Sequence, residues 1–169
     1  TSNTDSEVIH HGYRAWDIGS LLEKLDGMYA FAIYDRKKRK LIVSKDKWGE
    51  KPLFYAFHKN KFIFASEIKA ILDFVPALRN FSFEGIKSWI SYRGSHSSKT
   101  IYGGIYRLSP GTYLEINKEL KYREVRYYNL IDKALDKPEV TISSDQLNEI
   151  IEDRLSNAIE KRLISDVPI

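Results

Sequence analysis

The sequence predicts an α+β fold in which antiparallel hairpins are covered by helices. Two pairs of apolar, aromatic-rich runs are each joined by a short charged turn, at residues 35–40 and 58–61, and such pairs are typical of β-hairpins. After Ser66 the apolar residues change to helical spacing. The chain has 169 residues, of which 43% are hydrophobic and 30% charged. This length allows one domain with a hydrophobic core and is marginal for two.

Short helices are expected before the first hairpin. Residues 5–14 carry a weak helical stripe, residues 20–25 form one or two helical turns, and Asp26-Gly27 is a strong turn signal. The next run, residues 28–34, contains aromatic and β-branched residues and almost no polar position. This pattern predicts a strand that is buried on both faces.

Five consecutive basic residues, 36–40, occupy the expected tip of the first hairpin, and residues 41–44 return as its partner strand. A basic run can bind phosphates, but exposed hairpin tips commonly carry charge that keeps strand edges soluble. The formal net charge of the chain is only +4. We therefore favour a solvated tip over a nucleic-acid-binding patch.

The second hairpin follows a loop at residues 48–51. Pro52 begins the strand 53–57, where a missing N–H is tolerated, and residues 62–65 pair back.

Two short helices come next, each with a serine cap: residues 66–72 after Ser66 and residues 82–90 after Ser82. A turn is expected at residues 106–111, followed by a strand at residues 112–116.

The last part of the chain has a different character. Residues 132–143 lack aromatics and contain Lys, Asp, Pro and Ser, which indicates a linker. A long helix begins at Ser144, and its apolar residues follow the i, i+3, i+4, i+7 spacing that predicts one buried face. Residues 167–169 resemble the start of a buried strand. A helix and a strand with nothing to pack against suggest that the sequence is part of a longer protein.

Several chemistries find no support in the sequence. Cysteine is absent, so this chain offers no disulfide, thiolate metal site or cysteine nucleophile. Its four histidines lack metal-ligand spacing, and Gly103-Gly104 is not followed by the Lys-Ser or Lys-Thr of a phosphate loop. No apolar run is long enough to span a membrane. We expect a cytoplasmic protein that binds neither membrane nor nucleic acid.

Two acidic residues, Asp5 and Glu7, stand in a short polar segment ahead of the first helix. One interpretation is a helix cap, with Thr4 or Asp5 at the N-cap and Glu7 in the first turn. The other is that one carboxylate pairs with the ammonium group of a ligand. The residues alone favour the cap.

An ordered set of motifs resembles the glutamine-dependent asparagine synthetase family. The sequence contains LDGMYAFAIYDRKKRKLIVSKDKWGEKPLFY, then FIFASEIKAIL, IYRLSPGTYLEI and RLISDVPI. The family has L-x-G-x-F/Y-A-F-A, a charged hairpin, R-D-x-x-G-x-K-P-L-Y-Y, F-x-F-A-S-E-x-K-A-L, L-x-P-G and S-D-V-P in the same order. Each motif alone is weak, but together they cover nearly the whole chain.

The resemblance implies a particular fold and division of the chain. Residues 1–131 would be the later part of a glutaminase domain, a class II amidotransferase domain. Its fold would be part of the four-layer αββα sandwich of the N-terminal-nucleophile hydrolase type. Residues 132–143 would be a linker. Residues 144–169 would begin a synthetase domain with the first helix of an α/β ATP-pyrophosphatase-type fold.

The resemblance also implies a reaction and its participants. The full enzyme would hydrolyse glutamine and transfer the ammonia to a carboxylate activated by ATP and Mg²⁺, with aspartate as the expected acceptor. It could form a homodimer. The cysteine nucleophile would precede Thr1 and the ATP-binding loop would follow Ile169, so this segment alone would bind no ATP or metal and would be inactive. Asp5 matches the family's aspartate that binds the α-ammonium group of glutamine, which raises that interpretation above the cap.

Departures from the family pattern leave alternatives open. Lys45 and Lys47 replace two arginines, which keeps their charge but loses the guanidinium fork. The loop SYRGSHSSKTIYGG, residues 91–104, also differs from the family. The acceptor could instead be a sugar or a β-lactam precursor. A third possibility is a catalytically inactive scaffold or binding module.

Overall fold

The structure, a computed structural model, describes residues 4–94, 98–136 and 141–163. The chain divides into two compact units, Thr1–Leu130 and Ile131–Ile169, which are considered separately. We call them the first and the second unit.

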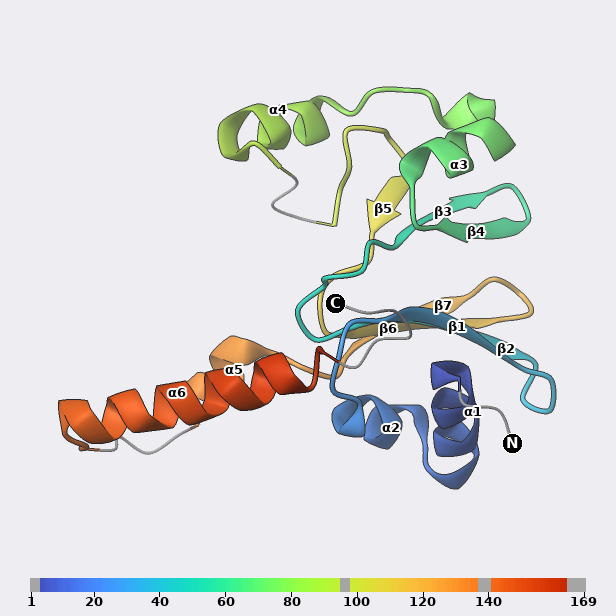
Figure 1. The fold of residues 1–169 in the computed structure, drawn as a ribbon. Helices are drawn as coiled ribbons and strands as arrows, with labels where there is room; N and C mark the ends of the chain where they lie inside the picture. Colours follow the sequence, from blue (N-terminus) through green and yellow to red (C-terminus); the bar gives the residue numbers. More distant parts are fainter. Residues whose placement is uncertain (1–3, 95–97, 137–140, 164–169) are drawn as a thin grey trace. The chain divides into compact units, whose positions relative to one another are not determined.

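The first unit contains two antiparallel sheets (Figure 1). The first sheet has the strand order β1-β2-β6-β7, with the bounds β1 Ala30–Asp35, β2 Lys40–Lys45, β6 Thr112–Asn117 and β7 Tyr122–Arg126. The second sheet has the order β4-β3-β5, with the bounds β3 Phe54–His58, β4 Lys61–Ala65 and β5 Ile105–Arg107. The chain passes from one sheet to the other twice, between β2 and β3 and between β5 and β6.

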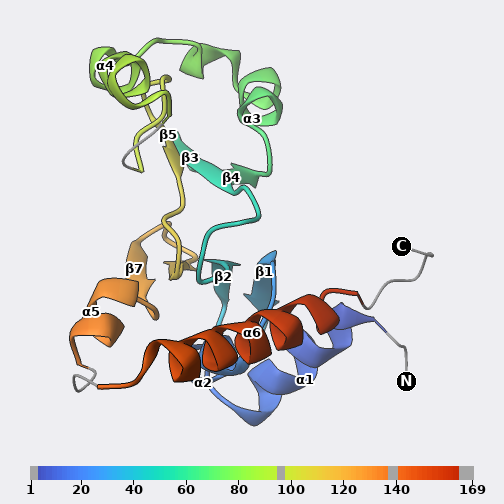
Figure 2. The same ribbon diagram turned by 60° about the vertical axis from the view of Figure 1, so that its left-hand side comes forward.

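Helices lie outside both sheets, so the first unit has four layers (Figure 2). The outer face of the first sheet is covered by α1 (Asp5–Ala15) and α2 (Ile18–Lys24). The second sheet is covered by α3 (Ile68–Phe74), which leads through a 3₁₀ turn at Pro76–Leu78 to α4 (Phe83–Tyr92). The α+β class with antiparallel sheets is therefore confirmed.

Three hydrophobic clusters hold these layers together. Between the sheets pack Val43, Leu53, Tyr55, Leu108, Leu114 and Ile116. Between the first sheet and its helices pack Ile18, Leu21, Leu22, Ile42 and Tyr113. Between the second sheet and α3 pack Ala56, Ile71, Leu72 and Ile105. Each cluster joins residues that are distant in the sequence, so burial of apolar area fixes the order of the layers.

Both predicted hairpins are confirmed, but the burial predicted for the first strand is wrong. Asp35 pairs with Lys40 across the first turn, and His58 pairs with Lys61 across the second. β1 is an edge strand in which exposed and half-buried residues alternate, and Tyr34 is 62% exposed. Alanines at positions 30 and 32 made the run look uniformly apolar, although they lie on its exposed face.

The predicted helix caps are only partly correct. Ser82 caps α4 and accepts a hydrogen bond from the N–H of Gly85, as expected. α3 begins two residues later than expected, with Glu67 rather than Ser66 at its N-cap. The predicted turn at residues 106–111 starts too early, because Tyr106 and Arg107 belong to β5.

The second unit contains most of α5 (Leu130–Leu135) and all of α6 (Ser144–Glu160). α5 includes part of the predicted linker, and four other linker residues, 137–140, lie outside the described residues. α6 is capped by Ser143 in a capping box with Gln146, one residue before the expected start. Its apolar stripe is 42–58% exposed rather than buried, at Leu147, Ile150, Ile151, Leu155 and Ile159. The strand predicted at residues 167–169 also lies outside the described residues.

Candidate functional site

Asp5, the predicted glutamine contact, is the first residue of α1. Thr4 occupies the N-cap position, but its side chain makes no capping hydrogen bond. Glu7 lies in the same first turn, and its carboxylate is 3.5 Å from the imidazole of His11 at the i+4 position. Glu7 is therefore part of a surface pair on the helix, whereas the role of Asp5 as a ligand contact stays a prediction.

A buried carboxylate, Asp46, organises the segment between β2 and β3. Its Oδ1 accepts hydrogen bonds from the N–H groups of Trp48 at 3.1 Å and Glu50 at 2.9 Å. Its Oδ2 accepts one from the N–H of Lys51 at 3.1 Å. Asp46 is fully buried, so three backbone donors satisfy a group whose burial would otherwise be costly. The tight loop KDKWGEK thus winds around one side chain.

The backbone of Asp46 connects this segment to the rest of the first unit. Its N–H donates to the carbonyl of Tyr29, and its carbonyl accepts from the N–H of Gly111 at 2.9 Å. Gly111 lies in the second segment between the sheets, and its own carbonyl accepts from the N–H groups of Tyr127 and Tyr128. Both passages between the sheets and the end of β7 therefore meet at one place.

Two lysines that flank Asp46 have different environments. Lys47 donates to the carbonyls of Glu23 at 3.1 Å and Leu25 at 3.0 Å, at the carboxyl end of α2, where a cation is favourable. Lys45 is fully buried, and its Nζ has no hydrogen-bond partner in the described part of the chain. Burial lowers the pKa of Lys45, and the positive charge of Arg107 lowers it further, while Asp46 opposes them.

A pair of tyrosines fixes the backbone of Lys45. The hydroxyls of Tyr29 and Tyr127 are 2.7 Å apart, and the Tyr127 hydroxyl donates to the carbonyl of Lys45 at 2.8 Å. Burial raises the pKa of both tyrosines. They are therefore neutral hydrogen-bonding groups at physiological pH.

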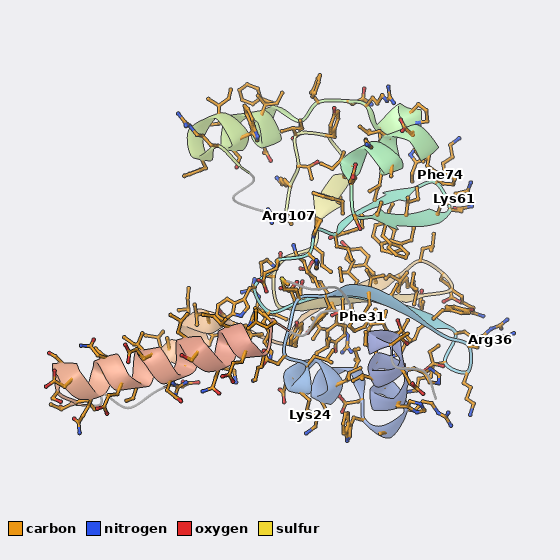
Figure 3. All side chains as sticks on the ribbon, in the orientation of Figure 1. Lys24, Phe31, Arg36, Lys61, Phe74 and Arg107 are labelled. Atoms are coloured by element: carbon orange, nitrogen blue, oxygen red, sulfur yellow. The ribbon has the colours of Figure 1, made fainter. Side chains whose placement is uncertain are left out.

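A cavity of about 630 Å³ opens beside this junction, within the first unit. Its wall includes the cations Lys47, Arg107 and Arg126 and the rings of Trp48 and Tyr128. The two rings pack edge to face with their centroids 5.5 Å apart. Figure 3 shows Arg107 at the end of β5 from which the chain runs on toward the first sheet. Within the described part of the chain, the residues that line the cavity include no acidic one.

The sequence interpretation did not identify Asp46, Arg107 or Arg126 as members of a site. One local signal was available for Asp46, because an aspartate just before a Gly-containing turn commonly accepts hydrogen bonds from the turn's N–H groups. The two arginines had no such signal, since they come from β5 and β7 and meet only in the folded chain. Lys51 contributes its backbone N–H to this loop, while its side chain is exposed.

The described residues contain no group of three or more His, Cys, Asp or Glu side chains that could hold a metal ion. Nor is any helix among them long and apolar enough to cross a membrane. His96, one of the four histidines considered above, lies in the stretch 95–97 that is not described.

Comparison with known proteins identifies the family. Residues 1–128 match the family described as glutamine amidotransferase domain. The chain is 33% identical to glutamine-hydrolyzing asparagine synthetase 2 of Bacillus subtilis, over 99% of this chain and 23% of that protein. It is 31% identical to amidase chry2 of Gibberella zeae, over 99% of this chain and 24% of that protein. The chain thus spans about a quarter of the length of these relatives.

A solved structure supports the fold. The glutamine phosphoribosylpyrophosphate amidotransferase of B. subtilis, determined in complex with ADP and GMP, superposes with a TM-score of 0.53. The match covers 76% of this chain and 23% of that chain, at 23% sequence identity. This similarity concerns the arrangement of sheets and helices.

Proposed function

Because the chain belongs to the glutamine amidotransferase domain family, we propose that it is part of an enzyme that hydrolyses glutamine and transfers the ammonia to an activated carboxylate. The observation that carries this proposal is the family match over residues 1–128. Relatives named as glutamine-hydrolyzing asparagine synthetases, which align with nearly the whole chain, favour aspartate as the acceptor and asparagine as the product.

In this proposal Asp5 binds the α-ammonium group of glutamine. A carboxylate at this place selects an amino acid over a simple amide, because a charge-assisted hydrogen bond is roughly twice as strong as a neutral one. Asp5 is the first residue of α1. Its place at an end of the helix, and not in the middle, supports this role. The nucleophile that attacks the glutamine amide belongs to a part of the enzyme outside this chain.

ATP and Mg²⁺ would be needed to activate the acceptor, and the described residues offer no set of ligands for the metal ion. We therefore propose that they bind to the synthetase part of the enzyme. We further propose that the enzyme is cytoplasmic and can form a homodimer.

The test compares two carboxylates of α1 in the whole protein from which this chain comes. Asp5→Asn should raise the KM for glutamine by about tenfold or more, because removal of a charged partner from a bound ammonium costs on the order of 2 kcal/mol. Glu7→Gln is the matched control and should leave KM within about twofold. Asp5→Asn should also lose its preference for glutamine over an analogue that lacks the α-amino group.

Three results would argue against the proposal. If the whole protein released no glutamate from glutamine, the proposed amidotransferase activity would be wrong. An unchanged KM for glutamine in Asp5→Asn would exclude the proposed role of Asp5 but not the amidotransferase activity. If the protein hydrolysed glutamine but formed no asparagine from aspartate and ATP, the glutaminase activity would stand and aspartate would be excluded as the acceptor.

A second candidate is an amidotransferase that acts on an acceptor other than aspartate, such as a sugar or a β-lactam precursor. The similarity to amidase chry2 of Gibberella zeae and amidase chyE of Penicillium rubens favours it, at 31% and 28% identity. The acceptor assay separates the candidates, because this enzyme would hydrolyse glutamine but leave aspartate unchanged. An inactive scaffold would do neither.

A further inference from the structure

We propose that the cavity beside the junction of the two sheets is a binding site for a multivalent oxyanion, a small molecule that carries phosphate or carboxylate groups. Its wall contains Lys47, Arg107 and Arg126, and none of the described residues that line it is acidic. Binding of an anion at this cavity is separate from the proposed reaction and can be measured without glutamine or ATP.

The two arginines are available for a ligand. Neither guanidinium forms an ion pair or donates a hydrogen bond to another residue in the described ranges. Arg107 is half-buried and Arg126 is exposed at the end of β7. Guanidinium groups bind phosphate and carboxylate through paired N–H donors, so two of them on one wall favour a ligand with several oxygens.

A fourth basic residue, Lys45, lies near this wall without lining it. The fully buried Nζ of Lys45 is within 3.2 Å of the position that a Cβ on Gly49 would take, and the same position is 2.8 Å from Cγ of Pro110. Pro110 lines the cavity. The ammonium group has no hydrogen-bond partner among the described residues. An unpaired buried cation is costly, and an anion in the nearby cavity would offset part of that cost.

The remaining walls suit a small ligand. Leu108 and Pro110 add apolar groups to the lining, and Ser109 lies between them in the sequence. Trp48 and Tyr128 form one side, and the cavity of about 630 Å³ has the size of an ordinary small-molecule site. Cations, a few polar groups and aromatic rings around a cavity of this size match a compact anion.

The test measures protection of individual arginines in the whole protein. Phenylglyoxal modifies arginine, and peptide mass spectrometry gives a separate rate for each residue. At 10 mM pyrophosphate we expect the rates for Arg107 and Arg126 to fall about tenfold, as mass action predicts for a dissociation constant of about 1 mM. Arg36, at the exposed tip of the first hairpin (Figure 3), should react at the same rate with and without pyrophosphate.

Variants show whether the protection comes from this cavity. Arg107→Gln should abolish the protection of Arg126, whereas Arg36→Gln should leave it intact. Succinate replaces pyrophosphate in a parallel series: protection by both probes would indicate an oxyanion site of broad specificity, and protection by one would identify its ligand chemistry. Equal labelling rates with both probes, or protection of Arg126 that persists in Arg107→Gln, would overturn the proposal.

Discussion

The N–H of Gly111 donates a hydrogen bond of 2.9 Å to the carbonyl oxygen of Asp46 and thereby joins the two segments that pass between the sheets. Both segments also line the cavity beside this junction. The first contributes Lys47 and Trp48, and the second contributes Ser109 and Pro110. The geometry of the cavity therefore depends on a few hydrogen bonds at one junction. This relationship allows stability and binding to be tested at the same residues.

We predict that Asp46→Asn lowers the free energy of unfolding by about 2–4 kcal/mol. The amide oxygen could still accept from Trp48 and Glu50, but the NH₂ group would then face the N–H of Lys51, a second donor. Urea unfolding followed by tryptophan fluorescence measures the change. Asp73→Asn is the control, because its exposed ion pair with Arg79 should contribute about 1 kcal/mol or less. Equal losses in both variants would show that Asp46 does not organise the loop.

Gly111 allows a second prediction. It has φ +62°, and a Cβ at this position would lie 2.5 Å from the carbonyl oxygen of Tyr128. Gly111→Ala should therefore cost about 2 kcal/mol or more, from left-handed backbone strain and this overlap together. Gly94→Ala is matched to it, since its nearest neighbour would be 4.0 Å away, and should change stability by about 0.5 kcal/mol or less. A neutral Gly111→Ala would contradict the close approach of the β5–β6 segment to Tyr128.

Elements with local sequence signals were predictable, and elements without such signals were missed. The hairpins were predictable because their signals are local: apolar runs on either side of a charged turn. β7 was missed because its sequence, YREVR, is mostly charged and exposed, as an edge strand allows. α5 was missed because it is short and lies in a stretch with the composition of a linker.

The candidate site was harder to predict for a physical reason. The hydrogen bonds of Asp46 within its own loop follow from its place before a turn. Its link to Gly111 joins residues 65 positions apart (111 − 46) and depends on the packing of both sheets. The resemblance to a known family supplied Asp5 but gave no information about Arg107 and Arg126, whose proximity is a property of the folded chain.

A third prediction concerns acid stability and Glu115 on β6. Burial acts to raise the pKa of Glu115, but hydrogen bonds from Lys40 at 2.5 Å and Arg123 at 2.9 Å hold it below its ordinary value. A lowered pKa in the folded state contributes stability that is complete above the unfolded value of about 4.3 and is lost as pH falls through the folded value.

Glu115→Gln should therefore be about 1 kcal/mol less stable than the parent at pH 7. The difference should shrink as pH falls from about 5 toward 3, because protonation removes the same charge from the parent. Urea unfolding at pH 7, 5, 4 and 3 measures this. Glu119→Gln, which changes an exposed carboxylate that pairs with Lys118, should show a small difference with little pH dependence. A Glu115→Gln difference that stays constant with pH would exclude the ion pairs as its cause.

The fourth prediction concerns Lys45, whose replacement should stabilise the folded protein, whereas replacement of Glu115 should destabilise it. Burial and the charge of Arg107 lower its pKa in the folded state, so the unfolded chain binds more protons between the folded value and the unfolded value of about 10.4. The stability of the parent should rise with pH across this window, because folding favours the neutral amine. Below the folded value the full cost of the buried ammonium is present.

Lys45→Met keeps most of the side-chain volume and removes the charge. Without added anion we expect it to raise the free energy of unfolding by about 1–3 kcal/mol at pH 7, with a smaller gain at pH 9.5. Lys87→Met, at an exposed position of α4, should change stability by about 0.5 kcal/mol or less at both pH values. Addition of 10 mM pyrophosphate should reduce the advantage of Lys45→Met, since the anion would bind the arginines of both proteins but gain the attraction of the buried ammonium only in the parent. A loss of stability in Lys45→Met at pH 7 would mean that the ammonium group has a partner in the folded protein, and the buried cation would then no longer support an anion site.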